Sequence, residues 1–333
     1  MNILITGGAG FIGSAFARMI VRDRPDWKVV VYDKLTYAGN LNNLKEVEGK
    51  FVFVQGDIAD REKIHNVLRE FDIQQIVNFA AETHVDRSIM SGLEFIETDV
   101  LGTYNLLTEA REKGVEKYLQ VSTDEVYGSI AQGKWTEDSP LLPNSPYSAS
   151  KAGGDLQVRA AFQTYGFPAI ITRASNNYGP YIYPEKIIPL FITNLLEGKN
   201  IPVYGDGGNV RDWLYVDDHC RGILTVLEKG TVGEIYNIGS EEELTNMELT
   251  QIILREMGFG EEKIEYVKDR AGHDRRYALD STKAQALGWQ PQVPFNEGIK
   301  TTIEWFKKNE QWWKPLKDGS YKEYYKQQYL ERK

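Results

Sequence analysis

The sequence predicts an α/β protein, in which a doubly wound parallel sheet is joined to a smaller, mixed α/β domain. In the first half of the chain, short β-branched runs alternate with amphipathic helical patterns. These runs are almost continuously apolar, as expected for parallel strands that are covered by helices on both faces. After residue 173 the alternation gives way to prolines, glycines and scattered helical patterns, which indicates a second domain.

Strands and helices alternate in the first half. The predicted strands are residues 2–6, 28–32, 51–55, 75–79, 117–122 and 169–172. Residues 60–71 and 102–113 are helical segments between them, and Leu106, Leu107 and Ala110 recur at helical spacing. This alternation is what predicts a parallel sheet.

The second half is less regular. Residues 174–208 contain four prolines, which favours loops and short helices over another full strand–helix–strand unit. Residues 211–228 predict a return to the first domain through a short strand and a helix, and residues 246–257 and 295–308 predict further helices. The resulting assignment gives residues 1–175 and 209–238 to the first domain and residues 176–208 and 239–333 to the second.

Composition narrows the class of protein. The 333-residue chain is 41% hydrophobic and 26% charged, as in ordinary globular proteins, and its formal net charge is −9. An acidic protein gains nothing from neutralising the phosphates of a polymer, so nucleic-acid binding is disfavoured. Cys220 is the single cysteine, which excludes an intrachain disulfide and fits a reducing cytoplasm. The sequence has no signal-peptide pattern and no run of about 18 apolar residues, so no membrane span is expected.

A glycine-rich turn follows the first predicted strand and precedes a predicted helix. Gly7, Gly8, Gly10 and Gly13 satisfy both the G-x-G-x-x-G and the G-x-x-G-x-x-G pattern. A backbone without side chains lets a pyrophosphate approach the helix N-terminus, where free N–H groups favour negative charge. The turn therefore predicts a Rossmann-type dinucleotide site in the first domain, and a substrate-binding role for the second.

Two carboxylates follow the next strands. Asp33 lies 20 residues after Gly13 at the end of the second strand, where it could accept hydrogen bonds from both ribose hydroxyls and repel a 2′-phosphate. That position favours NAD over NADP, although a strand-end aspartate can also simply cap a turn. Asp57, after the third strand, could contact the adenine edge or be a turn residue.

Tyr147 and Lys151 lie four residues apart at the start of a helical run that follows Pro146. This spacing places both side chains on one helix face. A tyrosine with an ordinary pKa near 10 is too weakly acidic to serve as a base, but a neighbouring ammonium and a positive nicotinamide favour its phenolate. The pair could therefore remove a hydroxyl proton while a hydride leaves the same carbon, although isolated pairs of this spacing are usually exposed helix.

A pair of adjacent acids follows the fifth predicted strand. Thr123, Asp124 and Glu125 come at its carboxyl end, which faces the ligand crevice in such sheets. Adjacent carboxyl groups can divide acid and base roles if their surroundings separate their pKa values. The alternative is a solvated turn.

The glycine turn together with the Tyr147–Lys151 pair resembles the pattern of the extended short-chain dehydrogenase/reductase family. The acid pair narrows the resemblance to the dTDP-glucose 4,6-dehydratases, since epimerase relatives usually lack it. Residues 80–88, 173–180, 211–213 and 272–277 also match. Ala271 and Thr83 depart from the expected proline and serine, and Ala271 puts the shape of a nucleotide-binding loop in doubt.

The resemblance implies a reaction in which oxidation at C4 of the sugar makes the C5 proton acidic. Tyr147, aided by Lys151, would take the C4 hydroxyl proton as NAD accepts the C4 hydride. Glu125 would remove the C5 proton, and protonated Asp124 would protonate the departing C6 hydroxyl. Thr123 would hydrogen-bond the C4 oxygen. The hydride returns to C6, so NAD is regenerated and should stay bound.

The resemblance also implies the residues that bind each ligand. Those implied for NAD are Gly7, Gly10, Phe11, Ile12, Gly13, Asp33, Lys34, Leu35, Thr36, Asp57, Ile58, Ala80, Ala81, Glu82, Thr98, Tyr147, Lys151 and Asn177. Those implied for the sugar nucleotide are His84, Thr123, Asn176, Lys186, Ile187, Pro202, Val203, Tyr204, Arg211, Asn246, Asp269, Arg270, Ala271, Gly272 and His273. Arg211 and Lys186 suit the diphosphate, because charge-assisted bonds to phosphate are strong.

Other interpretations remain open or are disfavoured. The four histidines show no metal-ligand spacing, so no metal site is expected. The aromatic tail, residues 305–329, is expected to pack on its own domain rather than bind nucleic acid. Helices near residues 100–113 and 148–165 could form a homodimer, as in the family. The alternatives in function are a nucleotide-sugar 4-epimerase, a 4,6-dehydratase for another nucleoside diphosphate sugar, and a silent NAD-binding regulator.

Overall fold

A seven-stranded, entirely parallel sheet forms the larger part of the molecule. The computed structural model describes residues 1–269 and 272–325. The strand order is β10-β6-β5-β4-β1-β2-β3, so β1 lies between two groups of strands that the chain adds in opposite directions. The strands are β1 (Asn2–Thr6), β2 (Lys28–Asp33), β3 (Val52–Gln55), β4 (Gln75–Asn78), β5 (Lys117–Thr123), β6 (Ala169–Ala174) and β10 (Ile235–Ile238). The predicted doubly wound α/β fold is confirmed.

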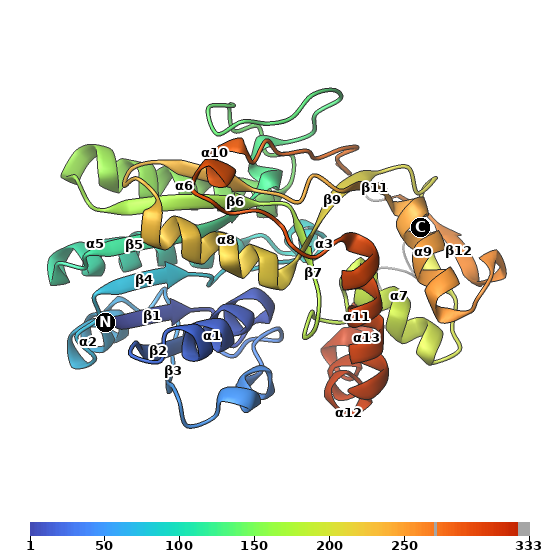
Figure 1. Ribbon diagram of the computed structural model, residues 1–333, viewed down its shortest axis with the longest axis horizontal. Coiled ribbons are helices and arrows are strands. Elements are labelled where there is room, and N and C mark those ends of the chain that lie inside the picture. The colour runs from blue at the N-terminus through green and yellow to red at the C-terminus, as the bar shows by residue number, and fades with distance from the viewer. Residues whose placement is uncertain (270–271, 326–333) are drawn as a thin grey trace.

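Helices cover both faces of this sheet (Figure 1). Side chains alternate along β1: Ile3 and Ile5 point to one face and Leu4 to the other. The first face packs against α1 (Phe11–Asp23) and α8 (Val216–Lys229), and the second against α2 (Arg61–Glu70), α5 (Thr103–Lys113) and α6 (Pro146–Tyr165). The strands are therefore buried on both sides, which explains their continuous apolar runs.

A second lobe lies beyond the carboxyl ends of the strands (Figure 1). It contains two small sheets, ordered β11-β9-β7 and β12-β8. Their strands are β7 (Asn176–Tyr178), β8 (Ile201–Tyr204), β9 (Val210–Tyr215), β11 (Glu243–Thr245) and β12 (Ile264–Val267). The helices of this lobe are α7 (Ile187–Leu196), α9 (Asn246–Met257), α11 (Phe295–Lys308), α12 (Glu310–Trp313) and α13 (Ser320–Tyr325). A core that includes Tyr178, Phe191, Trp213 and Ile299 holds the lobe together.

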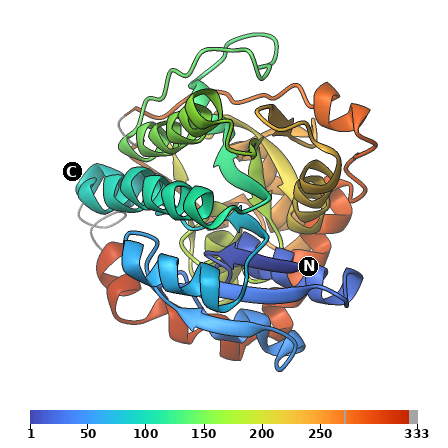
Figure 2. The ribbon, with the colours of Figure 1, turned by 90° about the vertical axis from the view of Figure 1, so that its left-hand side faces the viewer.

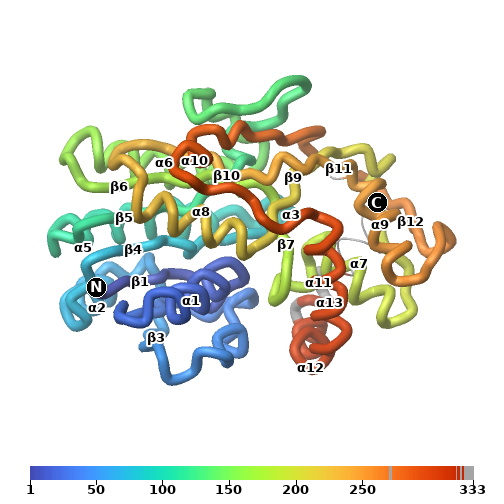
Figure 3. Tube along the Cα trace, viewed as in Figure 1, coloured from blue at the N-terminus to red at the C-terminus, as the bar shows by residue number. Residues whose placement is uncertain are grey.

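Several features of the second half differ from the sequence-based expectations. Strand β9 pairs with β7 and β11 rather than joining the large sheet, whereas α8, which follows it, packs on α1. Helix α7 runs for ten residues through the proline-rich segment, because Pro189 occupies its first turn, where a missing N–H costs no hydrogen bond. The chain then visits the first lobe again at α10 (Thr282–Ala286), beside β10, before crossing to α11 (Figure 3).

Short elements complete the connections. The remaining helices are α3 (Val85–Met90), α4 (Leu93–Phe95), the 3-10 helices η1 (Leu41–Val47), η3 (Asp124–Tyr127), η4 (Glu261–Lys263) and η5 (Pro315–Lys317), and the π-helical segment η2 (Ile96–Gly102), which leads into α5. Within the part of the chain that the structure describes, no helix is long and apolar enough to cross a membrane.

Candidate active site

The glycine turn between β1 and α1 forms one wall of the larger of two adjoining cavities. A Cβ atom added to Gly13 would lie 2.3 Å from the carbonyl oxygen of Gly7, so the turn closes only around glycine. Gly10 is the N-cap of α1, and the first turn of the helix carries no acidic residue. The first N–H groups of α1 are thus available to an anion such as a pyrophosphate.

Asp33, at the end of β2, is buried in this cavity with 7% of its surface exposed. Its Oδ2 accepts the N–H of Ala9 at 2.9 Å and its Oδ1 accepts the N–H of Leu35 at 2.7 Å. Burial raises the pKa of Asp33. Each carboxylate oxygen retains a second lone pair, so the side chain can still accept a hydrogen bond from a ribose hydroxyl.

The residues around Asp33 continue the wall. Lys34 and Thr36 line the cavity, while Leu35 lies outside its lining and takes a left-handed φ of 58°. Asp57 also lines the cavity, where its Oδ2 lies 2.6 Å from the ammonium of Lys34 and its Oδ1 accepts the N–H of Ala59. Asp57 is thus a turn residue that also faces the cavity, and its contact with an adenine edge stays a prediction.

Tyr147 and Lys151 lie near the start of α6, on the β5 side of the cavity rather than the β2 side. Ser145 and Ser148 form a reciprocal capping box, and Pro146 occupies the first helical position. The helix therefore begins abruptly, and Tyr147 and Lys151 both line the cavity. The ammonium of Lys151 donates to the carbonyl of Val121 at 3.0 Å, which ties α6 to β5.

The pKa of Tyr147 moves in the direction opposite to that expected from its lysine neighbour. Burial, followed by the charges of Glu125 and Asp99, raises the pKa of Tyr147 well above its ordinary value, and the hydroxyl of Thr123 offsets this in part. Burial, reinforced by three nearby carboxyl groups, thus outweighs the lysine in the protein alone, and the expected lowering in the presence of a positive nicotinamide stays a prediction. A phenolate here requires further positive charge in the cavity.

The acid pair occupies two different environments. Strand β5 ends at Thr123, whose Oγ1 caps η3 by accepting the N–H of Glu125 and donates to Asp124 Oδ1 at 3.1 Å. Asp124 is 2% exposed, and burial together with the charge of Glu125 raises its pKa well above the ordinary value. Glu125 is only half-buried. The carboxyl group with the raised pKa is thus buried, while its neighbour lines both cavities.

A second, smaller cavity adjoins the first. The two share Glu125, Asn176, Lys186, Ile187 and Trp213, so they meet beside the acid pair. The rest of the predicted substrate residues that line the smaller cavity are His84, Pro202, Val203, Tyr204, Arg211, Asn246 and His273. The predicted cofactor residues Gly7, Gly10, Phe11, Ile12, Gly13, Ile58, Ala80, Ala81, Glu82, Thr98 and Asn177 line the larger one.

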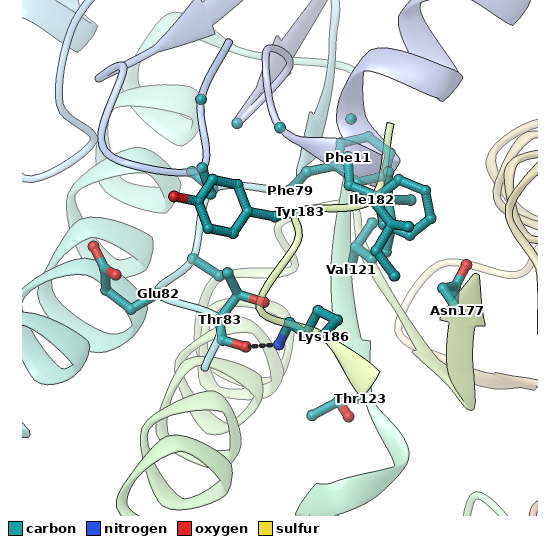
Figure 4. A pocket seen from close by; sticks show the side chains of 18 of the residues that line it. Phe11, Phe79, Glu82, Thr83, Val121, Thr123, Asn177, Ile182, Tyr183 and Lys186 are labelled. Atoms are coloured by element: carbon teal, nitrogen blue, oxygen red, sulfur yellow. Dashed lines mark hydrogen bonds between the residues drawn. The ribbon is translucent and has the colours of Figure 1, made fainter. Parts of the chain in front are cut away.

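Polar groups are concentrated where the cavities meet. The Oδ1 atom of Asn176 is buried and has no hydrogen-bond partner within residues 1–269 and 272–325. The ammonium of Lys186 donates to the carbonyl of Thr83 at 2.5 Å, below the apolar side chains of Phe11, Val121 and Ile182 (Figure 4). Arg211, 5% exposed, donates to the carbonyls of Val210 and Asp274.

The predicted loop at residues 269–273 is only partly described. Asp269 Oδ1 lies 2.6 Å from Nδ1 of His273, and the ring of His273 lies edge-on to Tyr204. Asp269 and Gly272 lie beside the smaller cavity's lining rather than in it. Arg270 and Ala271 lie outside the described residues, so their predicted roles stay predictions.

The comparisons with known proteins identify the family. A family profile described as GDP-mannose 4,6 dehydratase matches residues 4–302. A dTDP-glucose 4,6-dehydratase of Streptomyces niveus is 50% identical over 324 residues, which are 95% of this chain and 96% of the relative. The chain belongs to the dTDP-glucose 4,6-dehydratase family.

Solved structures agree with this assignment. The dehydratase DesIV of Streptomyces venezuelae, solved with NAD, matches with a TM-score of 0.93 at 54% identity over 95% of this chain and 100% of that chain. A UDP-glucose 4-epimerase from Thermotoga maritima, solved with UDP-glucose, matches with a TM-score of 0.87 at 32% identity over 93% of this chain and 100% of that chain. The dehydratase is the nearer of the two in both sequence and structure.

Several residues that line the larger cavity of this protein were not predicted from the sequence. Tyr37 and Tyr183 meet edge to face with ring centroids 5.3 Å apart, and His219 and Trp312 also contribute. None of them belongs to a motif, because tertiary packing alone brings them to the cavity. The described part of the aromatic tail packs on its own lobe as predicted, with Phe306 and Trp313 in its core, and Trp312 in addition donates its indole N–H to Asn43 Oδ1 of the first lobe at 2.9 Å.

Among residues 1–269 and 272–325, no group of three His, Cys, Asp or Glu side chains is placed to hold a metal ion. The candidate site is therefore built from the glycine turn, the Tyr147–Lys151 pair and the acid pair, with an uncharged hydrogen-bonding surface at Asn176.

Proposed function

We propose that this protein is a dTDP-glucose 4,6-dehydratase, which converts dTDP-glucose to dTDP-4-keto-6-deoxyglucose and regenerates NAD in each turnover. The observation that carries the proposal is the acid pair at the junction of the two cavities. Buried Asp124 lies next to half-buried Glu125, and both face the cavity that Tyr147 and Lys151 line. An epimerase has no hydroxyl to expel and so has no use for such a pair.

The larger cavity fits NAD. The N–H groups at the start of α1 suit the pyrophosphate, and the buried carboxylate of Asp33 suits the ribose hydroxyls and excludes a 2′-phosphate. When bound, NAD supplies positive charge near Tyr147 and a reversible acceptor for the C4 hydrogen and its electron pair. We propose the cofactor-binding residues named from the sequence as its contacts, except Leu35, which acts through its N–H on Asp33.

The chain's own residues then handle the protons. Tyr147, as the phenolate, takes the C4 hydroxyl proton, while Thr123 hydrogen-bonds the C4 oxygen. Glu125 removes the C5 proton, which the C4 ketone has made acidic, and half-burial leaves its carboxylate able to reach the sugar. Asp124, protonated because it is buried beside Glu125, gives its proton to the C6 hydroxyl, which leaves as water. The proton on Glu125 returns to C5 as C6 receives the hydrogen and electron pair that C4 gave up, so NAD is regenerated. The proton that Tyr147 took from the C4 hydroxyl balances the one that Asp124 gave to the departing water.

The smaller cavity suits the sugar nucleotide. We propose that Arg211 and Lys186 bind the diphosphate and that the unpartnered oxygen of Asn176 accepts a sugar hydroxyl. In domain terms, residues 1–175 and 209–238 would form the NAD-binding unit, and residues 176–208 and 239–333 the sugar-nucleotide-binding unit. Trp289 and the α10 segment of the latter pack on the former.

We also propose a homodimer and a cytoplasmic location. Large apolar side chains are exposed over α3, α4, η2, α5 and α6, and the last three of these elements lie side by side on one face (Figure 2). They are Ile89, Met90, Leu93, Ile96, Leu101, Tyr104 and Leu156, each more than 40% exposed. A patch of this kind suits a second copy of the chain. The single cysteine, buried Cys220, fits a reducing compartment.

A substrate panel read by mass spectrometry tests the function. Incubation with dTDP-glucose should give a product lighter by one water, with uridine, cytidine and guanosine diphosphate sugars as the comparison. Tyr147→Phe should give no product. An unchanged mass with an inverted C4 centre would instead establish an epimerase, and tight NAD binding with no turnover of any sugar would establish a regulator.

A further inference from the structure

His219 is a buried histidine for which the proposed reaction has no role. It lies near the start of α8, is 1% exposed and lines the larger cavity. Its Nδ1 atom lies 2.9 Å from Oδ1 of Asn177, which follows β6 on the short strand β7. The ring therefore faces the part of the cavity at the carboxyl ends of β5 and β6.

Asn177 fixes the tautomer of this histidine. The amide nitrogen of Asn177 donates to the carbonyl of Ser175 at 2.9 Å, so its Oδ1 is the atom that faces the ring. An amide oxygen only accepts, so Nδ1 of His219 must carry the proton. Nε2 then holds a lone pair and acts as an acceptor.

That acceptor is left without a partner by residues 1–269 and 272–325. Nε2 of His219 is buried and forms no hydrogen bond within the part of the chain that the structure describes. Burial alone lowers the pKa of His219 to about 3, so the ring stays neutral and keeps its lone pair at any pH near neutrality. A buried acceptor of this kind costs folding free energy unless a ligand supplies a donor.

The position of the ring narrows the choice of donor. Asp33 ends β2, on the far side of β1 from β5 and β6, so the adenosine half of a dinucleotide belongs there. Asn177 and Glu82 lie on opposite sides of the cavity (Figure 4). Glu82 interacts electrostatically with Lys34, which directly follows β2, so Glu82 marks the β2 side. The nicotinamide half thus lies nearer His219. Tyr147 and Lys151 line the same cavity and can take up the hydroxyls of the adjoining ribose, so the carboxamide N–H₂ is the donor left for His219.

We propose that His219 positions the nicotinamide ring by accepting a hydrogen bond from its carboxamide N–H₂ through Nε2, with Asn177 holding the imidazole in the required tautomer. The inference rests on the proposed use of NAD and adds a positioning residue to it. The bond fixes the rotation of the ring about its glycosidic bond, and so the face that the ring presents to the sugar. His219 thereby acts on the reaction through the cofactor rather than by touching the sugar.

Binding of two dinucleotides to cofactor-free protein tests this. In 3-acetylpyridine adenine dinucleotide a methyl group replaces the amide nitrogen, so the carbonyl is kept and the donor is lost. The wild-type protein should bind NAD about tenfold more tightly than this analogue, as expected for one buried hydrogen bond. Titration calorimetry measures both affinities without any turnover.

Two substitutions separate the ring nitrogens. In His219→Asn the amide can replace Nδ1 and keep the bond to Asn177, but it ends short of Nε2. This variant should lose about tenfold in NAD affinity and bind the analogue as the wild type does. In His219→Gln the amide oxygen can reach the position of Nε2, and the preference for NAD should be largely restored. His65→Asn, on α2 outside both cavities, is the matched control and should change neither affinity.

The outcomes are distinct. Equal loss of affinity for both dinucleotides in His219→Asn would show a purely structural role and overturn the proposal. If the variants do not fold, the wild-type protein still tests the proposal. Equal affinity for NAD and for the acetylpyridine analogue would also overturn it. Failure of the proposed function is seen separately, as NAD binding with the expected preference but no loss of water from dTDP-glucose.

Discussion

Adjacent carboxyl groups at Asp124 and Glu125 differ because the fold buries one and leaves the other half-open. The sequence identified both residues and suggested that their surroundings would separate their pKa values. The resemblance implied that Asp124 would be the acid, and the structure supplies the physical cause, since burial, followed by the charge of Glu125, raises the pKa of Asp124. The division of acid and base is therefore a property of the folded site.

Replacing the base should separate the two halves of the reaction. In Glu125→Gln, the C5 proton can no longer be removed, while the atoms that oxidise C4 stay in place. Stopped-flow absorbance should show the reduced cofactor forming, and the yield of the dehydrated product should fall by about 10²–10⁴-fold. Glu137→Gln, a partly buried glutamate outside both cavities, should turn over normally. Normal turnover in Glu125→Gln would remove Glu125 from its role.

Asp99 gives the protein alone a pH-dependent stability. It is buried beneath Lys151, accepts the Ser150 hydroxyl at 2.6 Å, and burial raises its pKa to about 6. A carboxyl group with a raised pKa stabilises the fold fully below its ordinary pKa of 3.8, and this contribution is lost as the pH rises to about 6 and above. Glu82, whose pKa burial raises to about 7, acts in the same direction.

Asp99→Asn should remove this loss, because the amide stays neutral. Its free energy of unfolding relative to the wild type should therefore rise by about 1–3 kcal/mol between pH 4 and pH 8, as measured by urea unfolding. Asp72→Asn, which removes an exposed carboxylate paired with Lys113, should give only a small change of the opposite sign. A difference for Asp99→Asn that does not vary with pH would contradict the assignment.

At the scale of elements, the sequence predicts best where apolar periodicity is long. The bounds of β1, α9 and α11 match the predicted ranges, and the other predicted strands differ by one or two residues at their ends. The three-stranded sheet of the second lobe was not predicted. Strands β7 and β11 are three residues long, too short for any alternation, and contacts distant in sequence make the sheet.

The glycine turn allows a sharp test of an element. A methyl group added by Gly13→Ala would lie 2.3 Å from the Gly7 carbonyl oxygen, so the turn must open and displace the start of α1. We expect NAD affinity to fall at least a hundredfold and the free energy of unfolding by about 1–3 kcal/mol. Gly114→Ala strains a left-handed residue at the end of α5, far from the cavities, and should cost about 1 kcal/mol while leaving NAD affinity intact.

For the whole molecule, the exposed apolar face over η2, α5 and α6 predicts the assembly. Leu101→Asp combined with Leu156→Asp places two charges on that face and should convert the dimer to a monomer in light scattering after size exclusion. Tyr266→Asp, on the exposed side of β12, should leave the dimer intact. A wild-type protein that elutes as a monomer at micromolar concentration would refute the dimer.

The tryptophan that joins the two lobes also supports the glycine turn. Asn43 accepts the Trp312 indole N–H and itself donates to the carbonyl of Ala9 in the glycine turn. Helix α12 is thus linked through Asn43 to the glycine turn, where we propose that the pyrophosphate binds. A side chain 269 residues further along the sequence than Asn43 therefore helps to hold the glycine turn in place, so a substitution at Trp312 should be felt at the opposite lobe.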